Sequence, residues 1–320
     1  MKERVDAFQQ RHPVVGLPLA TLLKFRDDQS TNLASMIAFW AFFSIFPLFL
    51  AFVTLLGYFL PADTKKNVLE HVSSMLPLLD TSTIGSLTGS WWALIVGLAS
   101  ALWSGTAAIR VTQFAFNSVW EVPYRERPSL LEQLGRSLLV LATLGVGIVV
   151  STIITGFVSG TDTGVNLGIA GRVIGYALAI VLDIGIFLAA FRMLTDRDVS
   201  FRDVLPGAVF SGLVFWILQS VSSVIVSRYL SNAQSTYANF ATVITILWWF
   251  YLQSVVTLLG AQANVVVKER LWPRGLVDPP ATEADHRAFE AYARERTYLD
   301  DQAVETSFEE DAGHRVPPGT

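Results

Sequence analysis

Six long stretches of this chain are almost entirely apolar, and shorter polar stretches separate them. A helix needs about 20 mostly apolar residues to cross the hydrocarbon of a bilayer, and each stretch is about that long. One soluble core does not hold six such helices. The pattern therefore predicts an all-α, polytopic membrane protein, folded as a six-transmembrane-helix bundle. The predicted spans are residues 33–60, 91–109, 138–158, 173–194, 204–226 and 241–267.

The polar stretches contain amphipathic segments. Leucines alternate with basic residues from Leu19 to Arg26, which predicts an interfacial helix before the first span. Apolar residues recur at helical spacing from Pro61 to Pro77 and predict a second interfacial helix. Residues 106–121 are too apolar for a free loop, so we expect a break at Ser104-Gly105 and a second, tilted helix after it. Glycine-rich residues 160–168 predict a loop.

These patterns divide the chain into three parts. Residues 1–32 form an N-terminal segment with its amphipathic helix, and residues 33–267 form the transmembrane domain. Residues 268–320 contain 12 acidic and 7 basic residues, and Pro279-Pro280 interrupts them. A short helix is expected from Glu283 to Arg296, within a tail that is otherwise largely disordered because it is too polar to bury a core.

Composition supports the bilayer as the solvent. The 320 residues are 52% hydrophobic and 16% charged, with a mean hydropathy of +0.46. Soluble domains are closer to about 25% charged. The sequence has no cysteine, which excludes disulfides, thiolate metal sites and cysteine nucleophiles.

The distribution of Lys and Arg predicts the orientation. Fifteen lie in the N-terminal segment, in the connections after the second and fourth spans, and just after the sixth span, whereas four lie on the opposite side. Positive residues concentrate on the cytoplasmic side of membrane proteins. Both termini are therefore expected in the cytoplasm, which an even number of spans also requires.

Chemistry-bearing motifs are scarce. The four histidines lie outside the spans without a second ligand at metal-site spacing. The sequence contains no GxxxxGK[ST] phosphate loop and no GxSxG nucleophile elbow. The basic residues follow topology and do not form a nucleic-acid groove. We therefore expect no enzyme activity, catalytic residue, cofactor, metal or nucleic-acid partner.

Asp183 is the most informative polar residue because it lies near the middle of the fourth span. Ionisable groups inside a membrane usually face a bundle interior or a water-filled cavity. Asp183 is either a substrate or proton site or a paired residue that locks helix packing. Arg110 is the preferred partner for it, and neutral pairing with Gln219 or Gln253 is a further option, whereas Arg192 is expected to extend to the interface.

Other residues within or beside the spans are cavity candidates. Pro47, close after Ser44, makes either a broken helix that lines a cavity or a static kink. Uncharged polar side chains inside spans either bridge helices or bind a ligand. These are Asn117, Gln219, Gln253 and Gln262.

Four sequence patches resemble the YihY family, also called the BrkB or virulence-factor family of bacterial inner-membrane proteins. The resemblance covers about residues 19–268. It departs at Gln262, where relatives often have glutamate, and at Tyr237-Ala238, where they often have Tyr-Gly. The patches are Ala38-Phe39-Trp40 with Ser44-Ile45-Phe46-Pro47; Ala101-Leu102-Trp103-Ser104-Gly105 with Asn117 and Arg125; Leu205-Pro206-Gly207-Ala208; and Tyr237 with Ile246-Leu247-Trp248 and Leu258-Leu259-Gly260-Ala261.

The resemblance implies six spans, a bacterial cytoplasmic (inner) membrane and a link to lipid or envelope export. Some members carry a ribonuclease label that these residues do not support. Our leading hypothesis is a transporter or exporter of an amphiphilic or lipid-like envelope molecule. The alternative is a non-transporting membrane scaffold or envelope-assembly partner. The expected partners are membrane lipids, a lipid-like substrate, and a second copy of the chain or another membrane protein.

Overall fold

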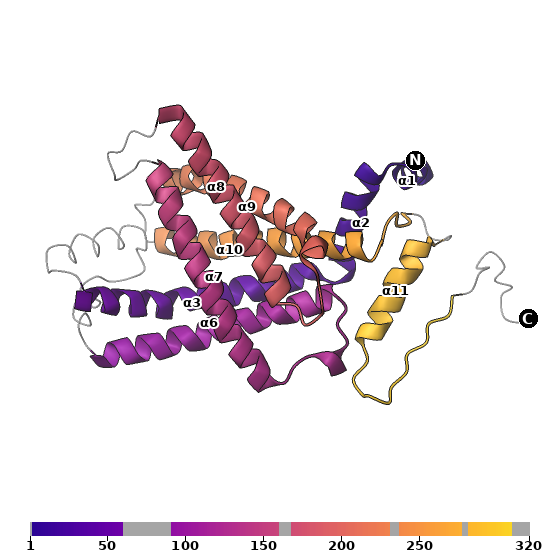
Figure 1. Cartoon of the computed structure of the whole chain (residues 1–320), viewed down its shortest axis with the longest axis horizontal. Helices are drawn as coiled ribbons and strands as arrows, with labels where there is room; N and C mark the ends of the chain where they lie inside the picture. Colours follow the sequence, from indigo (N-terminus) through magenta and orange to yellow (C-terminus); the bar gives the residue numbers. More distant parts are fainter. Residues whose placement is uncertain (1, 60–90, 160–167, 231–236, 277–280, 309–320) are drawn as a thin grey trace, which may run out of the picture.

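The computed structural model describes residues 2–59, 91–159, 168–230, 237–276 and 281–308, and within them it is helical without strands. The expected helix over residues 61–77 and loop over 160–168 fall mostly outside these ranges. Figure 1 labels the helices. They are α1 (Lys2–Arg11), α2 (Pro13–Asp27), α3 (Ser30–Phe59), α6 (Trp91–Val119), η1 (Tyr124–Glu126), α7 (Leu130–Ser159), α8 (Gly168–Met193), α9 (Phe201–Leu230), α10 (Tyr237–Lys268) and α11 (Glu283–Glu295).

Six helices in the described part are long and apolar enough to cross a membrane, which confirms the predicted number and the all-α class. Their qualifying segments have mean hydropathies from 1.3 to 2.3. A helix of 30 residues, such as α3, is about 45 Å long, so it extends beyond a hydrocarbon layer of about 30 Å. The segments are Ser30–Leu48, Trp91–Val119, Leu130–Gly147, Val173–Met193, Phe201–Gln219 and Val243–Lys268.

The predicted break in the second span is wrong. α6 continues without interruption from Trp91 to Val119, so the span and the expected tilted helix are one element. Ser104 is buried, and its hydroxyl donates to the carbonyl of Ala101 within the same helix. Gly105 lies against Leu141 of α7, so its small size serves helix packing here rather than a kink. α3 also continues through Pro47.

The six long helices form a closed ring. Each packs against the next in the order α3, α6, α7, α8, α9 and α10, and α10 packs against α3. The helices nearest the two termini, α1, α2 and α11, lie at one end of this ring, which we call the terminal end (Figure 1). α2 is docked on α10 there.

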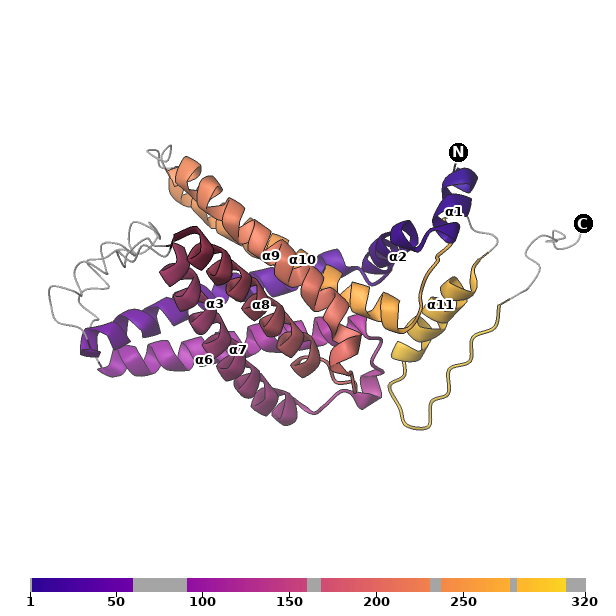
Figure 2. The ribbon, with the colours of Figure 1, turned by 45° about the horizontal axis from the view of Figure 1, so that its top comes forward.

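The hydrophobic core is concentrated at the terminal end. It takes the beginnings of α3 and α9 and the last turns of α6, α8 and α10. By contrast, residues 141–147, 213–219 and 243–253, farther from that end, include no buried residue. In Figure 2, α9 and α10 diverge from α3 and α6 toward the opposite end. Within the described residues, the bundle is therefore packed most densely at the terminal end. The core includes Leu33, Ala34, Phe116, Val119, Phe191, Leu194, Val204, Ala208, Leu258, Ala261 and Val265.

Candidate functional site

A stripe of polar side chains follows one face of α6. Thr106, Arg110, Gln113 and Asn117 are spaced by four, three and four residues, which places them on the same side of the helix. This α6 polar stripe faces the protein interior, since Gln113 and Asn117 are each 2% exposed and Thr106 is 4% exposed. Arg110 is half-buried. The stripe unites two residues expected to matter, Arg110 and Asn117.

Asn117, the last residue of the α6 polar stripe, joins α6 to the connection between α8 and α9. The Asn117 amide donates to the Asp196 carboxylate at 2.6 Å, and the Asp196 backbone N–H donates to Asn117 Oδ1 at 2.8 Å. Arg136 of α7 forms an ion pair with Asp196 and donates to the carbonyl of Thr195 at 2.8 Å. Asn117 therefore bridges elements at the terminal end. Bridging was one of the two roles expected for it from the sequence.

Arg110 and Gln113, earlier in the stripe, have polar atoms that lack hydrogen-bond partners within the described ranges. Buried Nε of Arg110 and Nε2 of Gln113 have no hydrogen-bond acceptor among the described residues. Arg110 forms no ion pair within the described ranges, Asp183 included. The expected pairing of Arg110 with Asp183 is therefore absent from this conformation.

The other expected residues lie in the more loosely packed part of the bundle. Asp183 is half-buried in α8 and is engaged with a partner, as is the exposed Gln219 of α9. Gln253 of α10 has a buried Oε1 without a described donor. The Ser44 hydroxyl, three residues before Pro47, donates to the Ala41 carbonyl at 2.7 Å within α3. The described contacts do not gather these residues into one cluster.

An apolar groove of about 440 Å³ lies between α3 and α10. Phe39 and Trp248 line it and are 53% and 54% exposed, so the groove opens to the surface of the bundle. Asp183 and Arg110 do not line it. Its walls are suited to hydrocarbon. The lining residues are Ser35, Ala38, Phe39, Ile244, Leu247, Trp248 and Tyr251.

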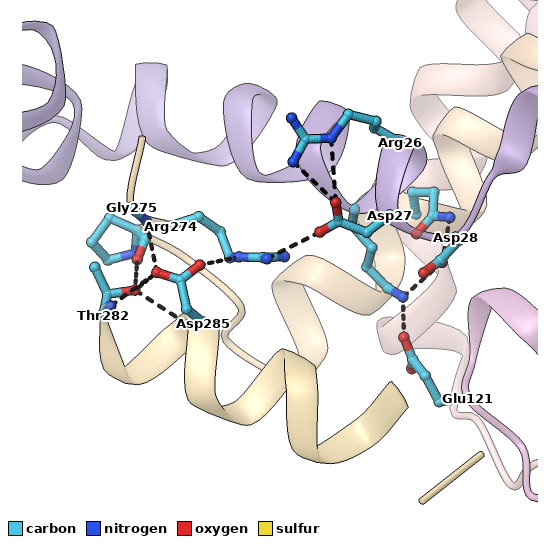
Figure 3. A network of polar contacts seen from close by, with 11 residues as sticks. Arg26, Asp27, Asp28, Glu121, Arg274, Gly275, Thr282 and Asp285 are labelled. Carbon is cyan, nitrogen blue, oxygen red and sulfur yellow. Dashed lines mark hydrogen bonds and ion pairs between the residues drawn. The ribbon is translucent and has the colours of Figure 1, made fainter. Parts of the chain in front are cut away.

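A buried ionic cluster, which we call the terminal lock, closes the terminal end (Figure 3). The ammonium of Lys24, which is fully buried, pairs with Asp28 at 2.8 Å and with Glu121. Gln262 of α10 donates to the Asp28 carboxylate at 2.7 Å and to the Ser30 hydroxyl at 2.9 Å. The lock thus ties α2, α3, α6 and α10 together, and it includes Gln262, one of the expected residues.

The local backbone places Glu121 in this lock. Glu121 follows the end of α6 with a φ of 46°, and the Val122 N–H donates back to the Asn117 carbonyl at 2.9 Å. This is the left-handed helix ending that glycine usually provides. Here the left-handed conformation is adopted by Glu121, and it directs the carboxylate toward Lys24, where the two form a buried ion pair.

The electrostatics of the terminal lock favour one proton kept on a carboxyl group. Burial raises the pKa of Glu121 to about 7, against the attraction of Lys24, and burial likewise raises the pKa of Asp28. Burial alone would lower the pKa of Lys24, but the attraction of Glu121 and Asp28 outweighs it and raises that pKa. One ammonium therefore stays charged between two carboxyls that compete for it.

The chain after α10 continues the terminal lock. Arg274 donates to Asp285 at 2.5 Å and to Asp27 at 3.0 Å (Figure 3). Thr282 and Asp285 form a capping box that starts α11, and Asp285 also accepts from the Gly275 N–H at 2.8 Å. The helix expected near Glu283 is thus present and is linked to α2 through Arg274 and Asp27, within a tail otherwise expected to be largely disordered.

Sequence reasoning missed most of the terminal lock. Lys24 was expected to be a basic residue of an interfacial helix, whereas it is a buried ion-pair partner. The spacing of Lys24 and Asp28 by four residues was a usable signal. The Lys24–Glu121 and Arg274–Asp27 pairs gave none, because the partners are far apart in the sequence. Among the described residues, no group of three His, Cys, Asp or Glu side chains could hold a metal ion.

Six apolar helices in a ring and polar side chains inside it define the class: a multi-pass α-helical membrane protein. Residues 21–285 match the family model described as virulence factor BrkB, and the chain belongs to this family. The resemblance noted in the sequence is thereby confirmed.

Two of three named relatives are described as membrane proteins. A UPF0761 membrane protein of Pseudoalteromonas translucida is 24% identical over 89% of this chain and 95% of its own length. One of Aliivibrio salmonicida is 25% identical over 76% of this chain and 80% of its own. YfkH of Bacillus subtilis, whose name describes it as ribonuclease-like, is 24% identical over 77% and 93%. No solved structure matches the chain.

Proposed function

We propose that this protein moves an amphiphilic, lipid-like molecule across the bacterial cytoplasmic membrane, with both termini in the cytoplasm. The observation that carries the proposal is the uneven packing of the bundle. The terminal end is sealed by the core and the terminal lock, whereas no residue of 213–219 or 243–253 is buried. Dense packing at one end of the described bundle is the arrangement expected for one state of an alternating-access cycle.

Polar groups within the ring support the same proposal. Asp183, Arg110 and Gln253 lie in spans that are otherwise apolar, and the groove between α3 and α10 offers a wall for hydrocarbon. An amphiphile needs both kinds of surface. A ribonuclease activity, which the name of YfkH suggests, has less support, because the lysine and carboxylates of the terminal lock are buried in mutual ion pairs.

The test is lipid translocation in proteoliposomes. Purified protein is reconstituted with fluorescent anionic and zwitterionic phospholipids, and the fraction that an impermeant quencher reaches is followed over time. We expect translocation faster than in protein-free vesicles. Asp183→Asn should slow it, whereas Asp198→Asn, at an exposed position between α8 and α9, should not. Translocation no faster than in protein-free vesicles would overturn the proposal and favour the scaffold.

A further inference from the structure

Arg110 is a cation in the bundle without an anion. Its Nε is buried without an acceptor, and none of the ion pairs within the described ranges includes Arg110. A half-buried cation is stabilised by a counter-charge, and the described ion pairs supply none for Arg110. Its guanidinium is therefore open to an anionic ligand.

The depth of Arg110 suits a lipid headgroup. It lies nineteen residues after Trp91, the first residue of α6. At about 1.5 Å per residue this is roughly 29 Å, close to the thickness of the hydrocarbon layer. The exposed Trp91 and Trp92 mark one interface, as paired aromatics often do. Arg110 thus lies near the headgroups of the other leaflet, but on the interior face of α6.

Gln113 supplies a second donor beside Arg110. It lies nearly one turn further along the α6 polar stripe and is 2% exposed. Its Nε2 is buried without an acceptor in the described part of the chain. The Ser137 hydroxyl, 3.5 Å from Gln113 Oε1, donates its proton to the Gln133 carbonyl at 2.6 Å, and Thr106, one turn before Arg110, uses its hydroxyl proton on the Trp103 carbonyl. The unused N–H groups of Arg110 and Gln113 are donors, which suit a negatively charged acceptor.

We propose that Arg110 and Gln113 bind the phosphate of an anionic lipid inside the bundle. The guanidinium fork matches a phosphate group in geometry and charge. This inference rests on the proposed function and names its substrate class as a lipid with a net negative headgroup. A zwitterionic headgroup is disfavoured because its cation would approach Arg110.

The inference is tested by binding, separately from transport. The melting temperature of the detergent-solubilised protein is measured with phosphatidylglycerol, phosphatidylcholine or inorganic phosphate. We expect phosphatidylglycerol to give the largest stabilisation, and Arg110→Gln to bind it about tenfold more weakly, as expected for a lost charged hydrogen bond. Arg192→Gln is the matched control, because Arg192 is exposed and lies over the Phe201 ring. It should retain binding.

A second variant covers the case in which Arg110→Gln does not fold. Gln113→Glu supplies Arg110 with an internal carboxylate, so the protein should fold and lose the response to phosphatidylglycerol. Equal stabilisation by phosphatidylcholine, an unchanged response in both variants, or full replacement by inorganic phosphate would each overturn the inference. Charge-dependent binding without translocation would leave it standing and reject only the transport proposal. Translocation with charge-independent binding would overturn the inference and leave the transport proposal standing.

Discussion

Lys24 shows how one side chain organises an end of the molecule. Its ammonium has two carboxylates within reach, and all three groups are almost completely buried. Two charges leave water at a cost that their attraction offsets only with good geometry, and a third charge makes the balance worse. The simplest resolution is that one of the two carboxyls keeps its proton near neutral pH.

This proton has a measurable consequence for stability. A carboxyl whose pKa is higher in the folded than in the unfolded chain binds more protons when folded, so the free energy of unfolding falls as the pH rises. For Glu121 the window lies between its ordinary pKa of 4.5 and about 7. Melting curves from about pH 5 to about pH 8 should show this decline, and Glu121→Gln should flatten it. An equally steep decline in the variant would contradict the shared proton.

Asp285 is the residue on which the docking of α11 depends. Besides Arg274, it accepts from the N–H groups of Gly275 and Thr282 and from the Thr282 hydroxyl. Asp285→Ala leaves the guanidinium of Arg274 with one partner less, and breaking a buried pair costs about 3–5 kcal/mol. We expect faster hydrogen exchange in residues 283–295. Glu283→Ala, in the same helix but with a side chain 92% exposed, should leave the exchange unchanged.

Few of these contacts could be predicted from the sequence. Polar residues within spans are visible as interruptions of an apolar run, so Gln262 and Asn117 were found. The partners of Lys24 and Arg274 were not, since Glu121 lies 97 residues from the first and Asp27 lies 247 residues from the second. Counting charges assigns a side of the membrane, and it cannot distinguish a solvated lysine from a buried one.

Among the elements, α9 and α10 approach each other most closely at Gly207 and Gly260. The Gly207 N–H donates to Asn264 Oδ1 at 2.6 Å. A Cβ atom on Gly207 would collide with the Gly260 carbonyl and the Asn264 amide, and one on Gly260 would collide with the Ser211 hydroxyl. Small residues here allow the two backbones to meet, as in many membrane helix pairs.

The crossing leads to a prediction with an internal control. Gly207→Ala should destabilise the protein by about 2 kcal/mol, in the range for overpacked sites. Gly145→Ala changes a glycine of α7 with no atom within 4 Å of the new methyl group. It should be neutral or stabilising by up to about 1 kcal/mol, the difference in helix propensity. Equal melting temperatures for both variants would show that the crossing tolerates a methyl group.

The existence of the elements was easier to predict than their continuity. Apolar runs located all six long helices because hydropathy reports compatibility with lipid. The same signal gave a false break at Ser104-Gly105, where small residues serve packing against α7. Hydropathy also does not specify which helices are neighbours, so the ring order and the sealed terminal end came only from the structure.

For the whole molecule, the distribution of Lys and Arg predicts that both termini lie in the cytoplasm. The sequence has no cysteine, so single cysteines can be introduced at Thr163 and Glu283 without a background. An impermeant maleimide should label Thr163→Cys on intact cells and Glu283→Cys only after the cells are disrupted. The reverse pattern would invert the orientation and place the terminal lock outside the cytoplasm.

The terminal lock also affects the biogenesis of the protein. The Gln9 amide donates to the Arg274 carbonyl at 2.6 Å, so the two ends of the folded chain hold each other. A ribosome synthesises all six spans before Arg274 and Asp285 emerge. Until then, Asp27 lacks the guanidinium that it meets in the finished protein. The contacts of Arg274 are therefore the last part of the terminal lock to form, and a chain truncated before Arg274 would leave Asp27 with Arg26 as its ion-pair partner.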